Sequence, residues 1–164
     1  MSRLENIKSK IYTREQIRAV LNVWRLLGKR VVFTNGCFDL LHLGHIDYLS
    51  KAADMGDKLV IGLNSDASAS ALKGPGRPIT DQLSRSLMLA SFSFVDAVVI
   101  FDEPTPLHLI ELVRPDILVK GADYSIEQIV GADLVLQYGG EVKTIEYLSG
   151  YSTTLIEKKI RSNS

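Results

Sequence analysis

The regular alternation of short apolar runs with helix-like segments constrains the fold of this chain most strongly. The runs are rich in β-branched and other apolar residues, and polar or turn residues bound each of them, which is typical of buried parallel strands. They lie at 31–33, 59–63, 97–101, 117–119 and 142–145. The pattern predicts an α/β protein, a doubly wound parallel five-stranded sheet with helices on both faces.

Helical periodicity fills the intervals between these runs. We expect an opening helix from Thr13 to about Gly28, begun by a capping box of Thr13 and Gln16. Residues 1–28 are then an N-terminal helix that packs on the domain or on a partner, and residues 29–164 form the domain itself. Further helices are expected at about 45–54, 81–94 and 105–113, with a short piece from 125 and a last helix from about 153.

Ligands of doubly wound sheets bind beyond the carboxyl ends of the strands, where the winding direction reverses. If the strand order is 3-2-1-4-5, this reversal lies between the first and the fourth strand. The loops after Phe33 and Val119 would then face each other across a crevice, and both loops have unusual sequences.

The first of these loops, at residues 34–45, reads TNGCFDLLHLGH. Its glycines are expected to let the backbone turn and approach a ligand closely. His42 and His45 are three residues apart, so on a helical turn both imidazoles face one way and donate to one phosphate. The alternative, that both histidines only cap and pack an ordinary βα turn, is disfavoured because two glycines and an acidic residue lie in the same loop. A metal site is disfavoured because only His108 and the single Cys37 could add ligands, and GxGxxG is absent.

Three further segments have residues suited to binding an anion. The KGPGRP segment at 73–78 and the KGADY segment at 120–124 combine lysine or arginine with glycine. In the third, GYSTT at 150–154, three consecutive hydroxyls precede the last helix and suit a phosphate cradle. A capping box of Thr154 and Glu157 would explain part of that segment.

The composition restricts the partners of the chain. Lysine plus arginine and aspartate plus glutamate each number 19, so no global charge favours nucleic acid or an acidic membrane. No segment has the length and apolar character of a membrane span or a secretion signal, and we expect a cytoplasmic protein. The lone Cys37 is expected to be a buried structural residue.

Together these motifs resemble the nucleotidylyltransferase superfamily. His42-Leu43-Gly44-His45 is similar to its HxGH signature, and Thr34-Asn35-Gly36 with Phe38 and Asp39 precedes it as in that family. The resemblance implies a Rossmann-like fold and makes His42, His45 and Lys73 catalytic. It implies nucleotide binding by Thr34, Asn35, Gly36, Phe38, Gly44, Lys120, Gly121, Asp123, Ser152, Thr153 and Thr154, and substrate binding by Asp39, Asp66 and Arg77.

Ser152, Thr153 and Thr154 resemble the second signature of the superfamily, with one departure. Glu157 stands where a basic residue is usual, so Lys158 or Lys73 would have to supply that contact.

Motifs from about Arg30 onward are similar to one branch, the adenylyltransferase domains of ADP-heptose synthases. This implies transfer of AMP from ATP to D-glycero-β-D-manno-heptose 1-phosphate, with Mg²⁺ on the triphosphate and a homodimer. The chain is too short for a sugar kinase domain, so a separate heptose kinase is expected. Two alternatives stay open: a cytidylyltransferase acting on glycerol phosphate or phosphoethanolamine, and a non-catalytic nucleotide-binding regulatory module.

Overall fold

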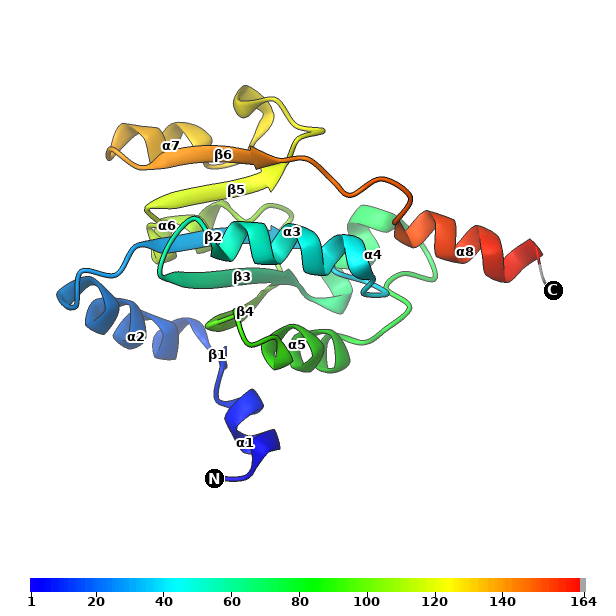
Figure 1. Ribbon diagram of the computed structural model, residues 1–164, viewed down its shortest axis with the longest axis horizontal. Coiled ribbons are helices and arrows are strands. Elements are labelled where there is room, and N and C mark those ends of the chain that lie inside the picture. The colour runs from blue at the N-terminus through cyan, green and yellow to red at the C-terminus, as the bar shows by residue number, and fades with distance from the viewer. Residues whose placement is uncertain (163–164) are drawn as a thin grey trace.

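The computed structural model describes residues 1–162 and contains one parallel sheet of six strands (Figure 1). The strand order is β1-β4-β3-β2-β5-β6. The strands are β1 (Ile11–Tyr12), β2 (Val31–Gly36), β3 (Lys58–Asn64), β4 (Ala97–Phe101), β5 (Ile117–Gly121) and β6 (Glu141–Ile145). The predicted α/β class is confirmed, and the five predicted strands keep the order 3-2-1-4-5.

Strand β1 corrects the prediction of five strands. Its two residues pair in parallel with the outer edge of β4, Ile11 opposite Val98 and Tyr12 opposite Val99. A two-residue strand has no periodicity of its own, so only the tertiary pairing reveals it. The first 28 residues therefore contain more than the single helix that we expected.

The helices mostly begin at the side-chain caps that their sequences offer. The predicted capping box of Thr13 and Gln16 is present at the start of α2, and His42 caps α3. Helices α1, α4 and α7 were not predicted, and the piece from Ser125 is a 3₁₀ turn at Ile126–Gln128. The helices are α1 (Arg3–Lys8), α2 (Arg14–Leu26), α3 (Leu43–Ala53), α4 (Asp66–Lys73), α5 (Gln82–Ser91), α6 (Leu107–Val113), α7 (Ala132–Gln137) and α8 (Thr153–Ser162).

Apolar side chains cover both faces of the sheet. On one face Ile17 of α2 and Leu109 of α6 pack in a buried cluster with residues of the strands. On the other face Leu49 of α3 and Leu89 of α5 belong to a second cluster. Helices on both sides thus cover the faces of the sheet, and the loops at its carboxyl edge are where ligands of such sheets bind.

Helix α8 lies beyond the carboxyl edge and extends away from the sheet (Figure 1). None of its described residues is buried. Within residues 1–162, no helix has the length and apolar character that crossing a bilayer requires.

Candidate active site

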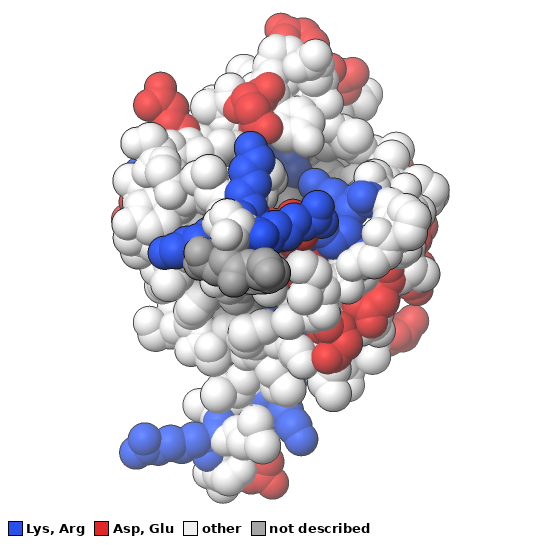
Figure 2. All heavy atoms as spheres, turned by 90° about the vertical axis from the view of Figure 1, so that its right-hand side faces the viewer, with Lys and Arg blue, Asp and Glu red and all other residues white. Residues whose placement is uncertain are grey.

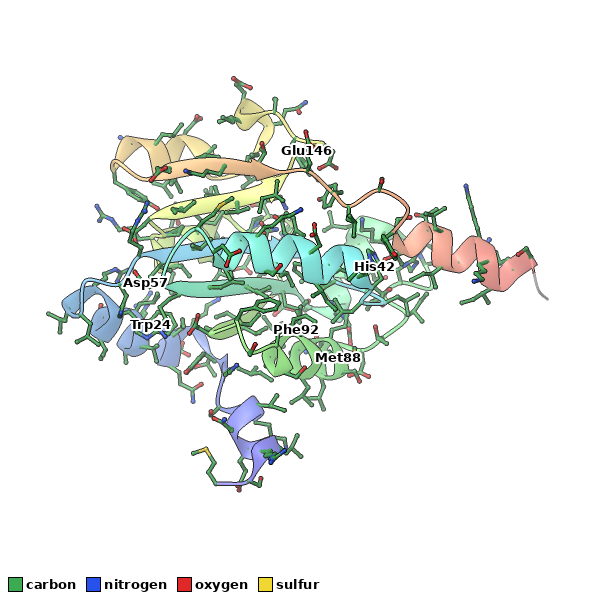
Figure 3. All side chains as sticks on the ribbon, in the orientation of Figure 1. Trp24, His42, Asp57, Met88, Phe92 and Glu146 are labelled. Carbon is green, nitrogen blue, oxygen red and sulfur yellow. The ribbon has the colours of Figure 1, made fainter. Side chains whose placement is uncertain are left out.

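The loops after β2 and β5 meet at the carboxyl edge, as the strand order predicted. The ammonium group of Lys120, at the end of β5, donates a hydrogen bond to the Asn35 carbonyl of β2 over 3.2 Å. Figure 3 shows His42 near this edge, whereas Trp24 and Asp57 lie toward the opposite end of the sheet. The point where the winding direction reverses, the switch point, therefore brings together two predicted segments. They are the loop at 34–45, here called the histidine loop, and the KGADY segment at 120–124.

The two histidines hold the first turn of α3 through reciprocal hydrogen bonds. The backbone N–H of Gly44 donates to Nδ1 of His42 over 3.1 Å, and the N–H of His42 donates to Nδ1 of His45 over 3.3 Å. The ring centroids lie 3.9 Å apart, and Phe38 meets the His45 ring edge-on. One local device thus caps the helix and fixes both imidazoles.

These bonds decide where the histidine protons are. A nitrogen that accepts an N–H bond carries no proton, so each neutral ring carries its proton on Nε2. Burial lowers the pKa of His42, and burial together with the charge of His42 lowers the pKa of His45 to about 4. At neutral pH the pair therefore offers two fixed Nε2–H donors without positive charge.

Gly44 is required by packing, not by a left-handed backbone. A Cβ atom there would come within 2.9 Å of the His42 ring and 3.2 Å of the Cβ of Tyr151. The positive φ angles of the loop belong to Phe38 (47°) and Leu40 (49°), where side chains make that conformation costly. The expectation that the glycines supply the turn was therefore wrong for this loop.

Asp39 is the anchor of the loop that precedes α5. Its carboxylate accepts from the backbone N–H groups of Ile79 (2.7 Å) and Thr80 (3.0 Å), from the Thr80 hydroxyl (2.7 Å) and from Arg77 (3.2 Å). Burial opposes its charge, but these donors outweigh burial and hold the pKa of Asp39 below its usual value. Both oxygens are thus used within the protein.

Arg77 joins this anchor to α8. Besides Asp39, its guanidinium binds the carboxylate of Glu157 at 2.5 Å, and both side chains are partly exposed. The predicted capping box of Thr154 and Glu157 is therefore wrong, because Glu157 pairs with Arg77. The Ser152 hydroxyl instead accepts from the Leu155 N–H over 3.1 Å at the start of the helix.

Of the hydroxyls at 152–154 that the sequence predicts as a phosphate cradle, only some are free to face solvent. The Thr153 hydroxyl donates to the Asp39 carbonyl over 3.0 Å, while the side chain of Thr154 is exposed. The first turn of α8 is thereby placed beside the histidine loop.

Basic side chains converge on the same region. Lys73 is the last residue of α4, a helix where we expected only a loop, and Lys120 is half-buried. Burial raises the pKa of the Cys37 thiol, and the positive charges of Lys73, Arg85 and Lys120 act against that rise. These three cations therefore all lie near the Cys37 thiol. Figure 2 faces this edge and shows lysine and arginine around a hollow.

The predicted Gly121 lies under the ring of Tyr147, a residue that the sequence did not point to, and Asp123 interacts with the same side chain. A Cβ at Gly121 would come within 2.2 Å of the Tyr147 ring, so only glycine fits beneath it. Burial raises the pKa of Tyr147 to about 12, and Asp123 adds to the rise by its charge and hydrogen bond. Tyr147 also packs on Tyr48, with centroids 5.7 Å apart.

Four of the predicted nucleotide-binding residues lie partly or wholly beneath the surface. Thr34 is fully buried, with its hydroxyl bonded to Tyr48 over 2.9 Å, and the Phe38 ring packs on Gly36. Asn35 and Gly36, at the end of β2, are half-buried. Among these four residues, Asn35 and Gly36 are the more accessible to a ligand.

A magnesium ion has no ready-made cage here. Among the described residues, no group of three or more histidine, cysteine, aspartate or glutamate side chains is arranged to hold a metal. Mg²⁺ on a triphosphate keeps water and phosphate ligands and needs few from the protein, so the residues suit an ion that arrives with the nucleotide.

The residue that sequence reasoning missed is Arg85 of α5. It is fully buried and donates to Asp66 of the predicted substrate set over 2.7 Å. An arginine on an amphipathic helix gives no sequence signal of burial, since most arginines lie at the surface.

Taken together, the parallel sheet, the paired imidazole donors and the cations at the switch point define a nucleotide-binding α/β domain of the nucleotidyltransferase class. The chain belongs to the cytidylyltransferase-like family, whose model matches residues 33–159. The nucleotidylyltransferase resemblance and the predicted enzyme class are confirmed at this level.

Curated relatives are similar over nearly the whole chain. A protein named Bifunctional protein HldE from Syntrophotalea carbinolica is 59% identical over 152 residues, which is 93% of this chain and 31% of that protein. Its namesake from Caulobacter vibrioides is 54% identical over 93% of this chain and 32% of its own length. The chain thus spans about a third of the length of these relatives.

Solved structures share the fold. The lipopolysaccharide core biosynthesis protein of Thermoplasma volcanium has a TM-score of 0.60 and 31% identity, with 76% of this chain and all of that chain covered. Pantoate-beta-alanine ligase from Francisella tularensis has a TM-score of 0.64 over 92% of this chain and 76% of that chain, at 16% identity. The second likeness concerns the fold alone.

Proposed function

We propose that this chain transfers AMP from ATP to D-glycero-β-D-manno-heptose 1-phosphate, giving ADP-heptose and pyrophosphate. The similarity to the bifunctional HldE proteins over 93% of the chain supports this branch of the family. The observation that carries the chemistry is the histidine pair, whose Nε2–H donors are fixed by the backbone of α3.

The proposed reaction is a direct displacement. A phosphate oxygen of the sugar 1-phosphate attacks the α-phosphorus of ATP and forms a new P–O bond. The bond from the α-phosphorus to the bridging oxygen breaks, and pyrophosphate leaves with that electron pair. No protein nucleophile takes part, so catalysis consists of positioning and of stabilising the charge that develops on phosphate oxygens.

The site residues divide into three proposed roles. His42 and His45 donate to the phosphate oxygens, and Lys73 and Lys120 supply positive charge at the same edge. The bound nucleotide lies against Asn35, Gly36, Gly44, Gly121, Asp123 and the hydroxyls of 152–154. The acceptor lies beside Asp66 and Arg77, and Asp39 acts by holding the loop at 77–80.

Mg²⁺ enters this proposal as part of the nucleotide substrate. A cytoplasmic location fits the use of ATP, and the homodimer stays a prediction. The acceptor implies a kinase reaction upstream that makes the sugar 1-phosphate.

Pyrophosphate release tests the proposal. The protein is incubated with ATP or CTP and Mg²⁺, and is offered heptose 1-phosphate, glycerol 3-phosphate or phosphoethanolamine. We expect release with ATP and the heptose only. Release with CTP and a small alcohol phosphate would assign the chain to a cytidylyltransferase. If the protein binds ATP but releases no pyrophosphate with any nucleotide and acceptor, the result would indicate a regulatory module.

A further inference from the structure

Arg85 is the largest polar side chain that the fold buries completely. Removing a guanidinium from water costs several kcal/mol unless its N–H groups find acceptors and its charge a partner. Its hydrogen bonds therefore show what the fold gains from this residue.

The acceptors of Arg85 come from three separate segments at the carboxyl edge. Nη1 donates to the carbonyl of Cys37 (2.7 Å), directly after β2, and to the carbonyl of Asn64 (2.8 Å), the last residue of β3. Nε donates to the carbonyl of Thr80 over 2.9 Å, just before α5. Nη2 donates to the carboxylate of Asp66 over 2.7 Å, in the first turn of α4.

These bonds continue into the histidine loop from a second side. Thr80, whose carbonyl Arg85 holds, donates its own N–H and hydroxyl to Asp39. The carbonyl of Asp39 in turn accepts the hydroxyl of Thr153 in α8. A continuous set of hydrogen bonds thus runs from the buried guanidinium through Thr80 and Asp39 to the first turn of α8.

We propose that Arg85 is a positioning residue that holds the histidine loop in place against residues 64–66 and the loop at 77–80. The inference deepens the proposed function, on which its kinetic part rests. The planar fork of an arginine holds several acceptors at fixed angles, whereas a lysine is a compact point charge and cannot. Arg85 touches neither substrate and acts only through the loops that it ties together.

The test compares Arg85→Lys and Arg85→Met with matched variants at Arg25. The Arg25 side chain of α2 also donates to a backbone carbonyl, that of Val113 over 2.6 Å, but at the far end of the sheet. Arg25→Lys and Arg25→Met therefore report the effect of losing such a bond away from the site.

The first measurement is hydrogen exchange of the free protein, which needs no activity. In folded Arg85→Lys we expect at least about tenfold faster exchange in residues 37–41 and 77–81, because these segments lose their shared anchor. Exchange in α2 and α7 should not change. Unchanged exchange in both loops, or a rise equal to that in Arg25→Lys, would overturn the proposal.

The second measurement is kinetic and separates positioning from folding. A displacement of about 1 Å costs roughly a hundredfold in rate. We therefore expect kcat per folded molecule to fall by that order in Arg85→Lys, with a higher KM for the acceptor and an ATP-analogue Kd within about threefold of wild type. A kcat that falls only with the folded fraction would contradict the proposal.

A third measurement on the unaltered protein covers the case in which the variants do not fold. In NMR spectra, a clamped Arg85 should show separate, slowly exchanging Nη proton signals that shift when an ATP analogue and sugar phosphate bind. Rapidly averaged signals would overturn the inference. If the wild type releases no pyrophosphate with any substrate pair, the proposed function fails, while the exchange and NMR results still decide whether Arg85 holds the loops.

Discussion

At the residue scale, two imidazole rings 3.9 Å apart would repel each other if both were protonated. Their Nδ1 atoms accept backbone N–H bonds, and burial favours the neutral form of both rings. The pair therefore works as two neutral donors of fixed direction, and the lysines supply the charge.

Removing either ring should reduce turnover and leave the fold intact. Loss of one preorganised donor to developing charge costs roughly 2.7 to 4 kcal/mol, so His42→Ala and His45→Ala should lower kcat by on the order of a hundredfold or more. His108→Ala is the matched control, since His108 is exposed on α6. Near-native pyrophosphate release by both variants would refute the role of the pair.

The low pKa of His45 predicts how stability depends on pH. At a pH between the ordinary pKa of 6.5 and the folded pKa of about 4, His45 is protonated in the unfolded chain but stays neutral in the folded protein. Stability should therefore fall as the pH drops through this window. Thermal unfolding at pH 7 and pH 5 measures the change, and His45→Gln should lose less between them than wild type or His108→Gln. An equal loss in all three proteins would count against the buried neutral ring.

At the element scale, the ion pair of Arg77 and Glu157 ties α8 to the loop before α5. Because no described residue of α8 is buried, the helix depends on such polar contacts to stay near the site. An acidic residue at 157 thus attracts the cation of a neighbouring loop, whereas a basic residue would repel it.

Breaking this pair should loosen α8 with little effect on the core. We expect Glu157→Gln to speed hydrogen exchange in 153–158 and to lower the free energy of unfolding by only about 1 kcal/mol, the upper range for partly exposed pairs. A double-mutant cycle with Arg77→Gln isolates the coupling. Asp47→Asn, which breaks the exposed pair with Lys51, is the control. Additive effects of the two substitutions would show that the pair does not hold the helix.

At the scale of the whole molecule, the residues that stabilise the fold and the residues of the proposed site lie in different places. The apolar clusters lie on both faces of the sheet, and the proposed site lies at one edge. Substitutions deep in a face should therefore change the folded fraction without changing the chemistry of the folded protein.

Leu21→Ala tests this separation. Leu21 is fully buried in α2. Truncating such a side chain costs about 2–5 kcal/mol, so the denaturation midpoint should fall clearly. Below the transition, kcat per folded molecule should match the wild type. A parallel loss of kcat at temperatures where the variant is folded would show that the far face and the site are coupled.

The sequence by itself determined the fold class and the five main strands, and with the strand order 3-2-1-4-5 it also indicated the loops that meet at the switch point. Apolar periodicity, side-chain caps such as Thr13, and the HxGH loop are local properties, so they can be read along the chain. The same holds for the histidine pair, since its two members are one helical turn apart.

Only the tertiary structure decided the partners of distant residues. Strand β1 exists because β4 offers it an edge, and Glu157 binds Arg77 rather than capping its own helix. Arg85 is buried because its acceptors, far apart in the chain, converge on one point. Such contacts depend on which loops the sheet brings together, and no local pattern encodes that convergence.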